Sequence, residues 1–233
     1  MYDSFYYLHI PKTGGRWFTV FVEPILYQEF KKNNIKISSS LSNGYGHYGW
    51  SPEITETTFV FSSTRNPVLQ TLSYITNLFQ KDYPTLNSTY IHNPNNNTSL
   101  DLLIHLILNP IFYSRIINNQ SKNISQYFPT GVPVSDLPVD VSVFIHNLNR
   151  VNAFMCCDTY LDNYIVAQNI LERFGLTTDK DYSHITENNR IYMSNPNTNK
   201  LYSLLNIEHK QIFKGFLTLD NYLHSKAQEK LII

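Results

Sequence analysis

Near the amino terminus the sequence reads Phe5-Tyr6-Tyr7-Leu8-His9-Ile10, followed by Pro11-Lys12-Thr13-Gly14-Gly15 and then by Arg16-Trp17-Phe18. The first six residues form a short apolar and aromatic run closed by Pro11, as in a buried strand of a parallel sheet. From Gly15 onward the apolar side chains recur at helical spacing, at Trp17, Phe18, Phe21, Val22 and Ile25. The pattern predicts a strand, a tight turn and a helix in immediate succession. We expect Pro24 to bend this helix or to end it early.

The same order of strand and helix returns twice along the chain. Residues 58–61 are a second candidate for a buried strand, and Pro67 opens a helix with apolar side chains at Leu69, Leu72, Ile75 and Phe79. Residues 152–157 are a third candidate strand, followed by a helix that Gly175 ends. Three such units predict the α/β class, with a central parallel sheet and helices on both faces.

We expect the remaining segments to complete a single domain over residues 1–233. Residues 82–98 are rich in turn-forming Asn, Pro and Thr, which indicates a surface loop. We expect residues 82 to about 138 as a whole to be an insertion of loops and helices that shapes the cleft for an acceptor substrate. Beyond it we expect a helix at 139–149, a polar loop at 176–200 and a last helix with a stripe of Ile212, Phe216, Leu219 and Leu223.

The composition excludes some classes of protein. The chain has 233 residues with 18 basic and 18 acidic side chains, so it lacks the basic excess of a protein that is held to nucleic acid by its charge alone. The amino terminus resembles neither a signal peptide nor a membrane anchor, and we expect a cytoplasmic chain. The cysteines, Cys156 and Cys157, are adjacent and rarely pair with each other, so we expect two buried thiols. No His, Cys or carboxylate cluster has metal-ligand spacing, and we expect no catalytic metal.

The turn between the first strand and helix has the chemistry of a phosphate cradle. Gly14 and Gly15 allow the backbone to approach an anion closely, and the amides at the start of the helix point toward it. Lys12 adds a positive charge, and the hydroxyl of Thr13 adds a donor. The loop is not that of the nucleoside triphosphatases, because its Lys precedes the glycines and the spacing G-x-x-x-x-G-K-[ST] is absent.

Two motifs resemble the carbohydrate sulfotransferases, especially the branch of the heparan and dermatan 2-O-sulfotransferases. His9-Ile10-Pro11-Lys12-Thr13-Gly14-Gly15 is similar to the loop that binds the 5′-phosphosulfate in that family. Phe61-Ser62-Ser63-Thr64-Arg65-Asn66-Pro67, continuing to Ser73-Tyr74, resembles the family's 3′-phosphate segment. The resemblance implies that Arg65 and Ser73 hold the 3′-phosphate of 3′-phosphoadenosine-5′-phosphosulfate (PAPS). A guanidinium fork suits a phosphate dianion.

A third element, Gly44-Tyr45-Gly46-His47-Tyr48-Gly49-Trp50, lies between these two motifs. The 2-O-sulfotransferase branch has a Gly-His element at this place, and the resemblance implies that His47 is the catalytic base. Removing a proton from an alcohol requires a base that titrates near neutrality, which suits histidine.

The chain departs from the family pattern at a few positions. Asn66 stands where the family usually has Asp, and Arg16-Trp17 replaces the small hydroxyl residues that usually follow the glycines. We expect Arg16 to serve as an anion ligand, and we expect the side chain of Trp17 to be part of the core. The set expected to bind the cofactor, through side chains or amides, is Lys12, Thr13, Gly14, Gly15, Arg16, Trp17, Arg65 and Ser73.

The resemblance implies a nucleotide-kinase-like sulfotransferase fold of the P-loop type. It also implies transfer of a sulfuryl group from PAPS to a hydroxyl of a saccharide or glycan-like acceptor, with 3′-phosphoadenosine-5′-phosphate (PAP) as product. Lys12 would stabilise the leaving group. Two alternatives remain open: a catalytically silent module that binds a nucleotide or glycan on the same scaffold, and a small-molecule kinase. The segment 82–138 lacks basic clustering, which favours a weakly charged acceptor.

Overall fold

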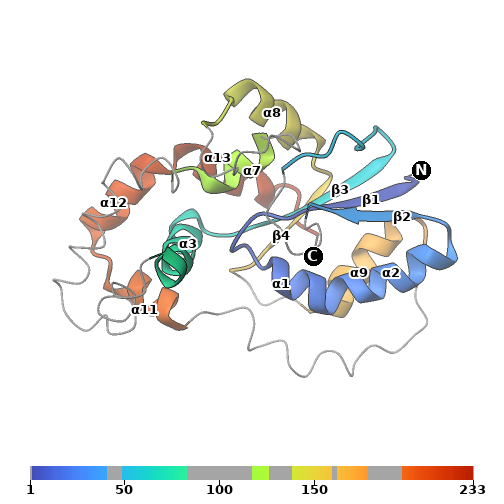
Figure 1. Cartoon of the computed structure of the whole chain (residues 1–233), viewed down its shortest axis with the longest axis horizontal. Helices are drawn as coiled ribbons and strands as arrows, with labels where there is room; N and C mark the ends of the chain where they lie inside the picture. Colours follow the sequence, from blue (N-terminus) through green and yellow to red (C-terminus); the bar gives the residue numbers. More distant parts are fainter. Residues whose placement is uncertain are drawn as a thin grey trace.

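The computed structural model describes residues 2–40, 49–82, 117–125, 138–158, 162–177 and 196–232. These form an α/β structure around a parallel sheet, with helices on both of its faces (Figure 1). The sheet consists of β1 (Ser4–Leu8), β2 (Lys36–Ser39), β3 (Thr58–Thr64) and β4 (Ala153–Cys156). Their order is β2-β1-β3-β4, and all neighbouring pairs are parallel. The expected class and parallel sheet are confirmed.

Alternation along the strands divides the core into two layers. Phe5 and Tyr7 of β1 face one cluster, while Tyr6 and Leu8 face the other. The first cluster is covered by α1 (Gly15–Trp17), the π-helical turn η1 (Phe18–Val22), α2 (Glu23–Lys32) and α9 (Asn163–Glu172). The second is covered by α7 (Asn119–Ser125), α8 (Val141–Arg150) and α13 (Thr218–Gln228). Both faces of the sheet are thus buried, as a parallel sheet requires.

Three further helices lie to one side of the sheet in Figure 1. They are α3 (Pro67–Asp82), α11 (Pro196–Leu204) and α12 (Ile207–Phe216). Both α11 and α12 contact α3. None of the helices in the described ranges is both long and apolar enough to cross a membrane.

The structure corrects the expectation for Pro24. The helical segment runs without a break from Gly15 to Lys32, so the expected early end is wrong. Pro24 lies in the first turn of α2, where a missing N–H does not disrupt the helix. The preceding turn is π-helical, and the N–H of Glu23 donates to the carbonyl of Phe18. The change of pitch ahead of the proline allows the helix to continue.

The strand β2 was not expected from the sequence. Its residues, Lys-Ile-Ser-Ser, are only partly buried at the edge of the sheet, so they lack the apolar run by which the other strands were found. Two expectations near the carboxyl terminus were also wrong. Helix α11 occupies the end of the expected polar loop, and the expected last helix is two helices that meet at Leu217. In this region the buried apolar side chains include Phe213, Leu217 and Leu223. Of the predicted stripe, only Leu223 is among the buried residues.

Helix α7 is the described part of the expected insertion. Every residue in it is buried, although six of the seven are polar. Its amino-terminal end is fixed by Asp220 of α13, whose carboxylate accepts hydrogen bonds from the Gln120 amide at 3.2 Å, the Ser121 amide at 2.7 Å and the Ser121 hydroxyl at 2.7 Å. Burial raises the pKa of Asp220 to about 6. This carboxylate therefore joins two helices that cover the same face of the sheet.

Candidate active site

The expected anion loop lies at the carboxyl end of β1, between that strand and α1. Lys12 and Gly14 both have left-handed backbone, with φ of 64° and 86°. The backbone N–H of Phe18 donates to the Gly14 carbonyl at 3.0 Å, which closes the first helical turn after the loop. A helix begins at this point, and the first amides of a helix point outward from its start, which makes this end favourable for an anion.

The hydroxyl of Thr13 does not take the role expected from the sequence. It is fully buried and donates to the Ile10 carbonyl at 2.7 Å. It also shares a hydrogen bond of 2.6 Å with the Ser63 hydroxyl, which in turn lies 3.1 Å from the Tyr7 hydroxyl. The side chain of Thr13 therefore fixes the loop to β3, and its backbone amide is the group left for an anion.

Both glycines of the loop are also required by packing. A Cβ at Gly14 would lie 2.4 Å from the Cys157 Sγ, and a Cβ at Gly15 would lie 1.6 Å from the His9 Nε2. The thiol of Cys157 also contacts the Thr13 carbonyl. Sequence reasoning assigned these glycines to an anion alone, and it did not anticipate that a cysteine and a histidine would lie against them.

The structure brings Arg65 to this loop. Arg65 follows β3, the strand next to β1, and its Nη1 donates to the Lys12 carbonyl at 3.4 Å. Its Nε lies 3.6 Å from the Asp158 Oδ1, an ion pair that the sequence did not predict. The residue is 8% exposed. Two motifs that are far apart in the sequence are thus adjacent, and the guanidinium is already held in place.

Helix α3 is held against the loop by Gln70, whose side-chain amide donates to the Pro11 carbonyl at 2.9 Å. Ser73 lies one turn further on the same face of α3 and is buried. Asn66 caps the helix, and its Oδ1 accepts from the Val68 and Leu69 amides at 3.1 and 3.2 Å. Because Asn and Asp cap helices about equally well, this departure from the family pattern preserves the local structure.

The remaining expected site residues lie in three different settings. Arg16 is exposed on α1, while Trp17 is 1% exposed and belongs to the core, as expected for its side chain. Since its side chain is in the core, only the amide of Trp17 is available to the expected anion site. His47 lies outside the described residues, as does most of the segment 82–138. The roles assigned to them remain predictions.

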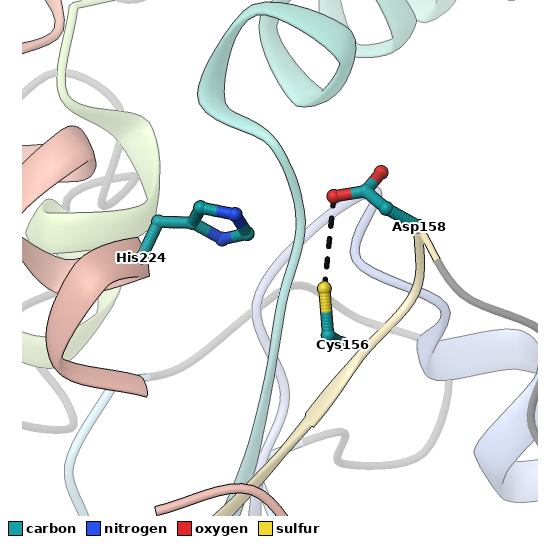
Figure 2. A group of neighbouring side chains, drawn as sticks. All are labelled: Cys156, Asp158 and His224. Atoms are coloured by element: carbon teal, nitrogen blue, oxygen red, sulfur yellow. Dashed lines mark hydrogen bonds between the residues drawn. The ribbon is translucent and has the colours of Figure 1, made fainter. Parts of the chain in front are cut away.

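One group of chemically active side chains was missed. Figure 2 shows Cys156 and Asp158, at the end of β4, facing His224 of α13. One ligand atom from each lies within 4.8 Å of the others. Burial raises the pKa of the Cys156 thiol and lowers that of His224, although Asp158 opposes the second effect. In the sequence, this group was signalled only by the polar residue Asp158 directly after a predicted strand. His224 could not be linked to it, because it lies far away along the chain.

The loop residues fit an anionic phosphate ester in part. The left-handed turn, the amides before Phe18 and the adjacent cations Lys12 and Arg65 favour such a group. The hydroxyl of Thr13 does not contribute. Comparison of the chain with protein-family models, curated proteins and solved structures gives no match. The functional argument therefore depends on the geometry of the site and on the two motifs.

Proposed function

We propose that the chain is a PAPS-dependent sulfotransferase that acts on a hydroxyl of a saccharide or glycan-like acceptor. One observation carries the proposal: the guanidinium of Arg65 bonds to the carbonyl of Lys12. The two motifs that resemble separate phosphate-binding segments thus meet at the carboxyl ends of adjacent parallel strands. In open α/β sheets, ligands bind at this edge.

Each residue has a distinct role in this proposal. The amides from Thr13 to Trp17 hold the 5′-phosphate, with Arg16 as an added cation, and Lys12 neutralises charge on the leaving group. Arg65 and Ser73 hold the 3′-phosphate, and His47 takes the proton of the acceptor hydroxyl. PAPS supplies the sulfuryl group that is transferred, and PAP is released.

A second candidate is a binding module without catalysis. Two observations favour it. Asp158 already pairs with the guanidinium of Arg65, and the hydroxyl of Thr13 already donates to the protein, so both groups are less available to a ligand. A small-molecule kinase is the weaker alternative, because the loop lacks the triphosphatase spacing. The two nucleotide-dependent enzymes differ in their ligands: a kinase prefers Mg·ATP, and a sulfotransferase prefers PAP without metal.

Thermal unfolding with added nucleotides tests the proposal. We expect a hundredfold excess of PAP over its dissociation constant to raise the melting temperature by roughly 5–10 °C, and we expect no rise with Mg·ATP. Lys12→Gly should abolish the shift without lowering the melting temperature of the free chain, because glycine adopts φ 64° without strain.

Two further variants complete this experiment. Lys31→Ala removes an equally charged residue at the far end of α2 and should leave the PAP shift unchanged. His47→Ala should keep the shift, since the proposed base does not hold the nucleotide. A wild-type chain that millimolar PAP does not stabilise would contradict both the sulfotransferase and a PAP-binding module.

A further inference from the structure

The three side chains of the missed group come from two elements that pack together. Cys156 and Asp158 are at the carboxyl end of β4, and His224 is on α13, which contacts β4. Cys156 is buried, His224 is partly buried and Asp158 is exposed. The group thus has a protected thiol at its base and an open side through which an ion can enter.

The separations are close to those of a tetrahedral metal site. The Cys156 Sγ lies 3.7 Å from the Asp158 Oδ2, and all three ligand atoms lie within 4.8 Å of one another. Bonds of about 2.3 Å to sulfur and 2.0–2.2 Å to nitrogen or oxygen place two tetrahedral ligands about 3.5 Å apart. The thiol and carboxylate are already at this separation. The imidazole of His224 lies within 4.8 Å of both.

Neighbouring residues orient two of the three ligands. The Thr64 hydroxyl donates to the Gln120 side chain at 3.2 Å, so it accepts from the His224 Nδ1 across the 3.2 Å between them. The proton is then on Nδ1, and Nε2 keeps the lone pair that a metal needs. The Asp158 Oδ2 accepts from the Asn66 amide. Such outer contacts are typical of residues that bind metals.

We infer that Cys156, Asp158 and His224 bind a zinc ion. A thiolate, an imidazole and a carboxylate are the ligands that zinc accepts, and a water molecule would take the fourth position. Coordination replaces the thiol proton, which is released to solvent, so that one thiolate and one carboxylate balance the two charges of the ion. The ion would fix α13 to the end of β4. The proposed sulfotransferase function assigns no role to the three residues, although the other carboxylate oxygen of Asp158 pairs with Arg65.

Cobalt substitution is the direct test. The purified chain, free of any affinity tag, is titrated with Co²⁺ under reducing conditions and followed by absorption spectroscopy. We expect one ion per chain, a near-ultraviolet thiolate-to-cobalt charge-transfer band and the visible bands of tetrahedral cobalt. One equivalent of Zn²⁺ should displace the cobalt and remove these bands.

Cys157 provides a matched control, because its thiol faces the Thr13 and Gly14 side of the sheet. Cys157→Ala should retain the spectrum, and Cys156→Ala should lose it. His224→Gln should reduce the affinity by at least about tenfold, and it keeps the inference testable if Cys156→Ala does not fold. The inference is overturned if no charge-transfer band forms, if the band survives in Cys156→Ala, or if His224→Gln binds cobalt as tightly as the wild type.

Discussion

Asp220→Ala is expected to lower the free energy of unfolding by roughly 3 kcal/mol or more, among the largest effects of any single substitution in this chain. The fully buried carboxylate accepts from the Gln120 amide and from both the amide and the hydroxyl of Ser121. Alanine leaves all three donors without an acceptor, and each such loss costs about 1–3 kcal/mol. Urea unfolding near pH 4, where the folded state keeps Asp220 protonated, followed by circular dichroism measures the change.

Asp220→Asn separates the hydrogen bonds from the charge. Its amide oxygen can accept from both donors of Ser121, while its NH₂ group faces the Gln120 amide, so the loss should be smaller than with alanine. Equal stability of the wild type and Asp220→Ala would contradict the role of this residue as the link between α7 and α13.

The wild type and Asp220→Asn should also differ in how their stability depends on pH. Burial raises the pKa of Asp220 from 3.8 to about 6, so between these values the folded state holds a proton that the unfolded state releases. The contribution of Asp220 to stability is therefore fully present below its unfolded pKa of 3.8 and is lost, by about 3 kcal/mol in all, as the pH rises through 6. Asp220→Asn lacks this decline. Parallel stability curves for the two proteins from pH 4 to 6 would contradict the assignment.

Gly14→Ala is expected to have the second large effect, for two separable reasons. A left-handed backbone at φ 86° costs a residue with a Cβ about 1–2 kcal/mol. The new methyl group would also lie 2.4 Å from the Cys157 Sγ, and such overpacking typically costs about 1–3 kcal/mol. The total, about 2–5 kcal/mol, is measured as the change in the free energy of unfolding.

A double-mutant cycle distinguishes the two causes. In a Cys157→Ala background the sulfur is absent, and the remaining Cβ is 3.4 Å away, which is close to ordinary contact. Gly14→Ala should then cost only the backbone part, about 1–2 kcal/mol. An equal cost in both backgrounds would show that the thiol does not pack against the loop.

The sequence was sufficient to predict the parallel sheet because β1, β3 and β4 are apolar runs followed by helices. It did not predict β2, whose four residues gain their place from pairing with β1 rather than from their own apolar character. Pro24 showed a similar limit, since a π-helical turn ahead of it accommodates the missing N–H. Local sequence patterns predict helices and strands that have an apolar face of their own. They fail where contacts with a neighbouring element decide whether a helix or strand forms or continues.

The candidate site shows the same division. The motifs singled out the loop after β1 and Arg65, which the structure places in contact, but the inward hydroxyl of Thr13 depends on Ser63, which lies on another strand. The pairing of Arg65 with Asp158 and the approach of His224 to Cys156 join residues that are remote in the sequence. No spacing rule applied to one chain reveals such contacts, because folding alone brings these side chains together.

The most direct test of the central claim is the affinity of the chain for PAP compared with 5′-AMP, which lacks the 3′-phosphate. Charge-assisted hydrogen bonds from Arg65 should make the wild type bind PAP at least about tenfold more tightly, and titration calorimetry measures both constants. Arg65→Gln should remove this preference while leaving the affinity for 5′-AMP almost unchanged. A wild-type chain that binds the two nucleotides equally, or binds neither, would contradict the claim that the two motifs form one nucleotide site.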